Sequence, residues 1–128
     1  MKHPYYTHRK YLKQILDSFD YTRPVHCLEL GTGDGSALIF NQYIKNNKNL
    51  FVTAYEDNHK WLEKTQNKYE IPNYSFNKIE NWSTFNYDLV KDKVYDLIFV
   101  DHMVSDKKWQ ERINSVENLK NHGKYIIV

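Results

Sequence analysis

The sequence predicts a single α/β domain, built on an open parallel sheet with helices on both faces. Short β-rich runs alternate with longer segments of helical periodicity, which is typical of strands joined through helices. The run YDLIFV at 95–100 is apolar nearly throughout, as expected for a central parallel strand covered on both faces. The length of 128 residues fits one domain, and no repeat or Pro/Gly/Ser-rich linker divides residues 1–128.

The expected elements follow along the chain from these patterns. A helix over 8–19 precedes the first strand, because apolar side chains recur there at helical spacing (Tyr11, Leu12, Ile15, Leu16 and Phe19). A turn follows at 20–24. Strands are expected at 25–30, 51–56, 74–77, 94–100 and 124–128, with helices at 36–46, 58–69 and 106–121 and an irregular or helical stretch at 79–90. We expect Gly123 to be the C-cap of the last helix, directly before the final strand.

Composition narrows the class of protein. A net charge of only +2 gives no electrostatic footprint for nucleic acid, and the locally basic N-terminus fits a solvated helix face at least as well. Cys27 is the only cysteine, so no internal disulfide can form, and a reducing cytosolic setting fits best. The N-terminus lacks the apolar core of a signal peptide, and no stretch approaches the roughly 20 apolar residues that cross a membrane. We therefore expect a soluble, cytoplasmic protein.

The segment ELGTGDG, from Glu29 to Gly35, predicts a small-ligand site. Its glycines follow the first expected strand, where they let the backbone turn sharply and approach a ligand closely. The N-terminus of the following helix adds partial positive charge. The dinucleotide-binding fingerprint has its third glycine three residues after the second, where this chain has Ser36 instead. A tight strand-to-helix turn without a ligand is the alternative interpretation of the glycines alone.

Side chains after the other strands extend this site, because ligands of open α/β sheets lie outside the carboxyl ends of the strands. Glu56 and Asp57 follow the second strand, about twenty residues beyond the glycines, where a carboxylate can accept hydrogen bonds from both ribose hydroxyls. The alternative role there is a helix N-cap, which suits Asp57 or Asn58 better than Glu56. Asp101 and His102 follow the fourth strand and are the candidate catalytic residues.

The residues after the third strand are the least certain part of the site. Ile79, Glu80, Asn81 and Trp82 could flank an adenine ring and contact its exocyclic amine. A tryptophan in such a stretch is more often a core residue than a ligand contact.

Taken together, these motifs resemble the class I S-adenosylmethionine-dependent methyltransferases, whose sheet is Rossmann-like, over roughly residues 10–128. The resemblance implies S-adenosylmethionine as cofactor and leaves the methyl acceptor open. It places the methionine portion at Glu29, Gly31 and Gly33, the ribose at Glu56, and the adenine at Glu80 and Asn81. The further expected cofactor-binding residues are Thr32, Gly35, Asp57 and Asp101. Asp101 and His102 would lie near the reacting methyl group. Asn121-His122-Gly123 stands where most members have Leu-x-Pro-Gly-Gly.

The end of the fourth strand, Phe99 to His102, also resembles that of catechol O-methyltransferase and its relatives, where the aspartate binds magnesium. The lysine base of that enzyme lies three residues after the aspartate, and this chain has Val104 there. One visible carboxylate does not establish a site for a cation that takes about six oxygens, so we expect no metal. The alternatives are a strand-end carboxylate that caps a backbone N–H for Asp101 and a partly buried, hydrogen-bonded ring for His102.

By the same resemblance two further strands are expected beyond the fifth, and the sequence ends inside the fifth. An apolar edge at 125–128 predicts a longer natural protein, a covering partner, self-association or a minimal variant. The alternatives to a methyltransferase are a domain of this fold that binds a cofactor or partner without catalysis and, disfavoured by the glycine spacing, an NAD-dependent oxidoreductase. Aminopropyl transferases share the fold, but no clear polyamine-binding acidic cluster is visible.

Overall fold

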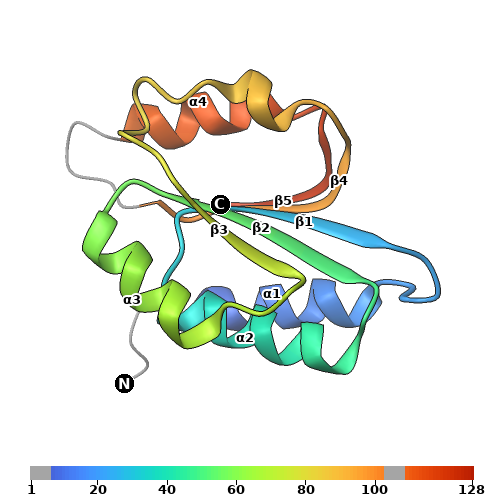
Figure 1. Cartoon of the computed structure of the whole chain (residues 1–128). Helices are drawn as coiled ribbons and strands as arrows, with labels where there is room; N and C mark the ends of the chain where they lie inside the picture. Colours follow the sequence, from blue (N-terminus) through green and yellow to red (C-terminus); the bar gives the residue numbers. More distant parts are fainter. Residues whose placement is uncertain (1–6, 103–108) are drawn as a thin grey trace.

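Five parallel strands form one sheet in the order β3-β2-β1-β4-β5 (Figure 1). The computed structural model describes residues 7–102 and 109–128. The strands span β1 Val25–Leu30, β2 Leu50–Glu56, β3 Tyr74–Lys78, β4 Tyr95–Val100 and β5 Gly123–Ile127. The chain runs outward from β1 to β3 and then crosses to β4 on the other side of β1. This reversal of strand order lies between β1 and β4, which is where open α/β sheets bind ligands.

Helices cover both faces of this sheet, as predicted. Helices α1 (Thr7–Ser18), α2 (Asp34–Asn46) and α3 (His59–Tyr69) lie on one face, and α4 (Trp109–Leu119) with the short 3-10 helix η2 (Tyr87–Val90) lies on the other (Figure 1). Each face has its own buried apolar core. Leu16 of α1 and Phe40 of α2 belong to the first core, while Val90 of η2 and Leu119 of α4 belong to the second.

Most predicted boundaries agree with the structure to within one residue, and three elements differ more. Helix α2 begins at Asp34, two residues earlier than expected, because Gly33 is its N-cap with extended backbone (φ −165°, ψ 170°). In the stretch expected to be irregular or helical, only Tyr87–Val90 is helical. The last helix is shorter than predicted and ends at Leu119, and positions 106–108 of the prediction lie outside the described residues.

The prediction that Gly123 caps the last helix is wrong. Gly123 lies four residues beyond the end of α4 and is the first residue of β5, paired with Tyr95 of β4. A Cβ at this position would lie 2.8 Å from the side chain of Ile98, so a larger residue would collide with the neighbouring strand. The glycine therefore serves strand packing and not the helix end.

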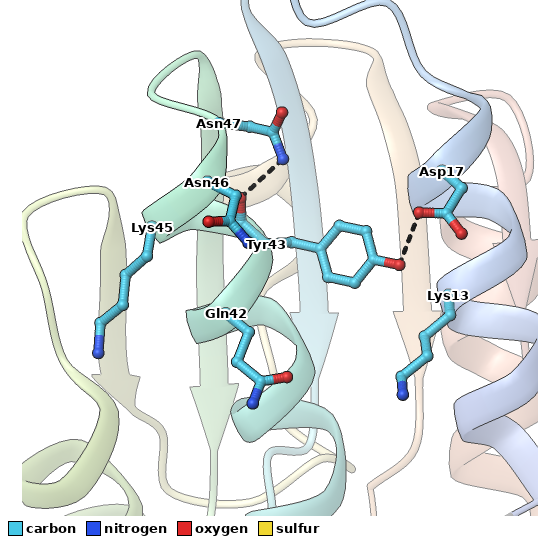
Figure 2. A pocket seen from close by; sticks show the side chains of 7 residues that line it. All are labelled: Lys13, Asp17, Gln42, Tyr43, Lys45, Asn46 and Asn47. Carbon is cyan, nitrogen blue, oxygen red and sulfur yellow. Dashed lines mark hydrogen bonds between the residues drawn. The ribbon is translucent and has the colours of Figure 1, made fainter.

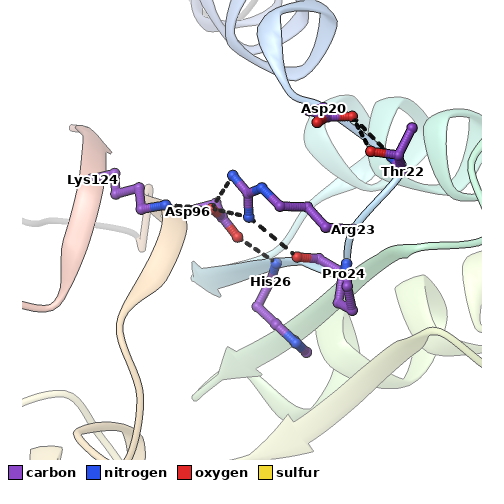
Figure 3. Close-up of polar contacts among 7 residues, drawn as sticks. All are labelled: Asp20, Thr22, Arg23, Pro24, His26, Asp96 and Lys124. Atoms are coloured by element: carbon purple, nitrogen blue, oxygen red, sulfur yellow. Dashed lines mark hydrogen bonds and ion pairs between the residues drawn. The ribbon is translucent and has the colours of Figure 1, made fainter.

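Asp96 is the exception in the otherwise apolar strand β4. Its side chain is buried at the amino end of the sheet, where Oδ2 accepts a hydrogen bond from the backbone N–H of His26 at 2.9 Å (Figure 3). Oδ1 forms ion pairs with Arg23 at 3.5 Å and with Lys124 at 3.4 Å. Asp96 thus ties β1 and β5 to the strand between them, at the end of the sheet opposite to the glycine loop.

Strand β5 lies parallel beside β4, as predicted, and is the last strand on this side of the sheet. Leu97 pairs with Tyr125 and Phe99 with Ile127. Tyr125 is 49% exposed and Val128 is 50% exposed, so part of this edge is apolar and open to solvent.

Within the described ranges, no helix has the length and apolar character that crossing a lipid bilayer requires.

Candidate functional site at the carboxyl ends of the strands

The loop between β1 and α2 follows a path that only glycine permits at its first position. Gly31 has a φ of +88°, and it is the one described residue in the left-handed region. A Cβ there would lie 2.3 Å from both the backbone N and the Cα of His102. The N–H of Gly31 donates to Tyr55 and that of Asp101 donates to Leu30, both at 2.8 Å. The backbones of β1, β2 and β4 therefore meet at the switch point of the sheet.

Glu29 lies beneath this loop and is fully buried. Its Oε2 accepts a hydrogen bond from the hydroxyl of Ser36, and its Oε1 accepts one from Tyr74, both at 2.5 Å. Burial raises the pKa of Glu29 to about 7, although these hydroxyl donors oppose the shift. Its predicted contact with a methionine group stays a prediction, because its oxygens already bond Ser36 of α2 and Tyr74 of β3.

Glu56 braces the glycine loop from the end of β2. Its Oε1 accepts the N–H of Thr32 at 3.0 Å, and its Oε2 accepts the N–H groups of Asp57 and Asn58 at 3.0 Å each. Burial is the main cause that raises the pKa of Glu56 to about 7. An ionised carboxylate has about four lone-pair sites, so this one has room for one further hydroxyl donor. A second hydroxyl would displace one of these backbone groups.

Asn58 is the N-cap of α3, which agrees with the capping role expected for Asp57 or Asn58. Its side-chain oxygen accepts the backbone N–H of Trp61 at 3.0 Å, at the start of α3. Asp57 is half-buried beside Glu56, and its ligand role stays a prediction.

Two side chains that the sequence did not single out flank the glycine loop. The indole of Trp61 lies against Gly33, where a Cβ would be 3.3 Å from the ring, and its N–H donates to the carbonyl of Thr32. Arg9 of α1 lies against Gly35, where a Cβ would be 3.2 Å from its Nε. No local pattern marks either residue, because both meet the loop only through the packing of their helices.

Asp101 lies beside the loop at the end of β4, at the position predicted for a residue near the reacting group. Its side chain is 37% exposed and forms an ion pair with Arg112 of α4 at 3.4 Å. The Nε of Arg112 also donates to the carbonyl of His102 at 2.8 Å. Arg112 therefore fixes both the carboxylate and the backbone of this strand end.

His102, the second candidate catalytic residue, lies in the interior of the protein. Its ring is fully buried, stacked on Trp82 at 4.3 Å between centroids, and its Nε2 lies 3.1 Å from the hydroxyl of Ser115. That hydroxyl in turn bonds Tyr87 at 2.5 Å. The ring therefore packs between the sheet and α4, which favours the alternative of a buried, hydrogen-bonded ring, and its catalytic role stays a prediction.

The residues after β3 separate into three environments. Glu80 is exposed at the surface. Asn81 caps its own turn, with its side-chain oxygen 3.0 Å from the N–H of Thr84. Trp82 is 2% exposed and lies in the core, which is the alternative considered for it. Contacts of Glu80 and Asn81 with an adenine ring stay predictions.

A surface pocket between α1 and α2 lies away from this site (Figure 2). It is formed by Lys13 and Asp17 of α1 and by the end of α2 and the residue after it (Gln42, Tyr43, Lys45, Asn46 and Asn47). The hydroxyl of Tyr43 donates to Asp17 at 2.7 Å across it. Because α2 starts at the glycine loop, its last turn lies at the opposite end of the sheet.

Among residues 7–102 and 109–128, no three histidine, cysteine or acidic side chains gather as ligands for a metal ion.

Comparison with solved structures identifies the fold. A protein from Staphylococcus aureus, provisionally described as a caffeoyl-CoA O-methyltransferase, is 21% identical with a TM-score of 0.61, over 91% of this chain and 52% of that one. Precorrin-6y C5,15-methyltransferase from Geobacter metallireducens is 16% identical with a TM-score of 0.57, over 91% and 56%. An O-methyltransferase family protein from Burkholderia thailandensis is 12% identical with a TM-score of 0.58, over 90% and 34%.

The chain therefore has the fold of the class I methyltransferases, and it spans roughly a third to a little over half of these three proteins. No protein-family profile and no curated protein sequence matches it.

Proposed function

We propose that this chain binds S-adenosylmethionine at the glycine loop and is the cofactor-binding part of a methyltransferase. The observation that carries the proposal is the meeting of the Gly31 backbone with the end of β4, at the switch point of a methyltransferase-type sheet. The three glycines at 31, 33 and 35 let the backbone pass close to its neighbours, because a Cβ at these positions would meet His102, Trp61 and Arg9. Glycine also lets a ligand approach the remaining side of this backbone closely.

The charges around the loop support this cofactor over a dinucleotide. Glu29, Glu56 and Asp101 place three carboxyl groups at the ends of β1, β2 and β4. Asp101 is the partly exposed one of the three, and its carboxylate would attract a cationic sulfonium and repel a pyrophosphate. Arg9, beside the N-terminus of α2, is a cation that a ligand carboxylate would meet.

In the proposed reaction the bound cofactor supplies an activated methyl group. Glu56 would hold one ribose hydroxyl through its remaining lone pair, and Asp101 would lie at the end where the acceptor enters. Arg112 keeps the Asp101 carboxylate oriented. Methyl transfer from a sulfonium needs no protein nucleophile. The chain would therefore act by holding the methyl donor in line with the acceptor.

A second candidate function is cofactor binding without transfer. It is favoured by the burial of His102 and by the ion pair that holds Asp101, the other candidate catalytic residue, to Arg112.

Calorimetry with S-adenosylhomocysteine, S-adenosylmethionine and NAD tests the binding proposal. We expect both sulfur ligands to bind and NAD to bind more weakly; tighter binding of NAD would refute the assignment. Turnover to S-adenosylhomocysteine with candidate acceptors then separates the enzyme from the non-catalytic domain. Asp101→Asn keeps the size of the side chain, so a loss of turnover with intact cofactor binding would support its role.

A further inference from the structure

Trp61 stands out at the site because it contacts the glycine loop from a helix that begins 26 residues after Gly33. It lies in the first turn of α3, which starts at His59. Its indole N–H donates to the carbonyl of Thr32, and its ring lies 3.3 Å from the place where Gly33 would carry a Cβ. The hydrogen bond and the close approach of the ring thus both act on the peptide unit that joins Thr32 to Gly33.

The loop is held from the opposite side by Glu56. The N–H of Thr32 donates to the Glu56 carboxylate, and the carbonyl of Thr32 accepts from Trp61. Both backbone groups of Thr32 are therefore bonded to side chains from the β2–α3 region. Because Gly31 and Gly33 on either side have no side chain of their own to restrict them, these contacts decide the path of the loop.

Trp61 is itself held firmly enough to act in this way. Its backbone N–H is capped by Asn58 at 3.0 Å, and its carbonyl accepts the hydroxyl of Thr65 at 2.7 Å. The side chain is 38% exposed, and Lys64 Nζ lies 5.5 Å from the centre of its ring. The indole is therefore partly exposed beside the glycine loop and is not part of the apolar core, and its N–H has a hydrogen-bond partner.

We propose that Trp61 is a positioning residue of this site, which fixes the Gly31–Gly33 segment in its ligand-binding path through the Thr32 carbonyl and the Gly33 backbone. The proposal rests in part on the proposed function, since it assigns the ligand at this loop as the cofactor. A loop fixed before binding does not lose conformational freedom when the ligand arrives, and this preorganisation raises affinity.

The test uses Trp61→Phe, which removes the N–H donor and retains an aromatic ring. We expect affinity for S-adenosylhomocysteine to fall about 5- to 10-fold, as the loss of one neutral hydrogen bond predicts. Lys60→Ala, an exposed change in the same turn of α3, is the control and should bind like the wild type.

Hydrogen exchange gives a readout that does not depend on the ligand. In Trp61→Phe we expect the Thr32 amide to exchange about tenfold faster, while the amides in the middle of β1 and β4 keep their protection. Faster exchange throughout the chain would indicate global destabilisation and would overturn the positioning role. Equal affinity and equal exchange of the Thr32 amide in the two proteins would overturn it as well.

A double-mutant cycle tests the steric contact. Gly33→Ala places a Cβ against the indole and should weaken binding in the wild type, whereas the smaller ring of Trp61→Phe should reduce this penalty. Strictly additive effects would contradict the contact. If the wild-type chain binds no S-adenosylhomocysteine, the proposed function fails, and the exchange experiment still decides whether Trp61 holds the loop.

Discussion

Replacement of Gly31 by alanine should be among the most damaging single changes in this chain. A φ of +88° is unfavourable for a residue with a Cβ, at a cost of about 1–2 kcal/mol. The new Cβ would also lie 2.3 Å from backbone atoms of His102, where ordinary contact begins at 3.4 Å. Backbone cannot rotate away as a side chain can, so the ends of β1 and β4 would have to separate.

This separation strains the hydrogen bond from Asp101 to Leu30, and the shift of Gly31 strains its bond to Tyr55 of β2. Both bonds are 2.8 Å long, and each contributes about 1 kcal/mol. We therefore expect Gly31→Ala to lower the free energy of unfolding by about 3–5 kcal/mol, a large part of the ~5–15 kcal/mol of a typical domain. Any ligand at this loop should bind more weakly as well.

Urea unfolding followed by circular dichroism measures this difference, with Gly35→Ala as the matched control. Gly35 lies in the first turn of α2, has no positive φ, and would place its Cβ 3.2 Å from the flexible side chain of Arg9. Alanine is the better helix former, so the control should change stability by no more than about 1 kcal/mol. A Gly31→Ala protein within 1 kcal/mol of the wild type would refute the reasoning about the loop.

Three substitutions and one measurement of association test other parts of the structure. The raised pKa of Glu29, about 7, lets the folded chain bind more protons than the unfolded chain between pH 4.5 and 7. Melting temperatures should therefore fall as the pH rises through 7, and this fall should be smaller in Glu29→Gln; an unchanged pH profile would contradict the burial effect. Asp96→Asn breaks the ion pairs of a buried carboxylate and should lower the free energy of unfolding in urea by about 1–3 kcal/mol. An unchanged free energy of unfolding would show that these ion pairs do not stabilise the fold. Asn58→Ala removes the cap of α3 and should cost about 1 kcal/mol by the same assay. Sedimentation at increasing protein concentration should reveal self-association through the exposed edge of β5. A chain that stays monomeric at every concentration would contradict this prediction.

The sequence by itself determined the fold class and most of the glycine loop. Alternation of β-rich and helical segments predicts a parallel sheet, and the five strands, their order along the chain and the helices on both faces are confirmed. Glycine spacing and an acidic residue after β2 are local signals, so the positions of Gly31 and Glu56 at the switch point could be expected. Local signals work here because backbone conformation and periodicity depend on residues near in sequence.

Tertiary structure alone decided which of these side chains are buried and which are exposed to solvent. His102 and Asp101 are neighbours in sequence, yet one ring is buried on Trp82 and one carboxylate is partly exposed beside Arg112. Trp61 reaches the loop only because α3 packs beside the start of α2, and Gly123 is required by Ile98 on the neighbouring strand. Such contacts join residues far apart in the chain, so their distances and burial are set by packing and leave no local pattern in the sequence.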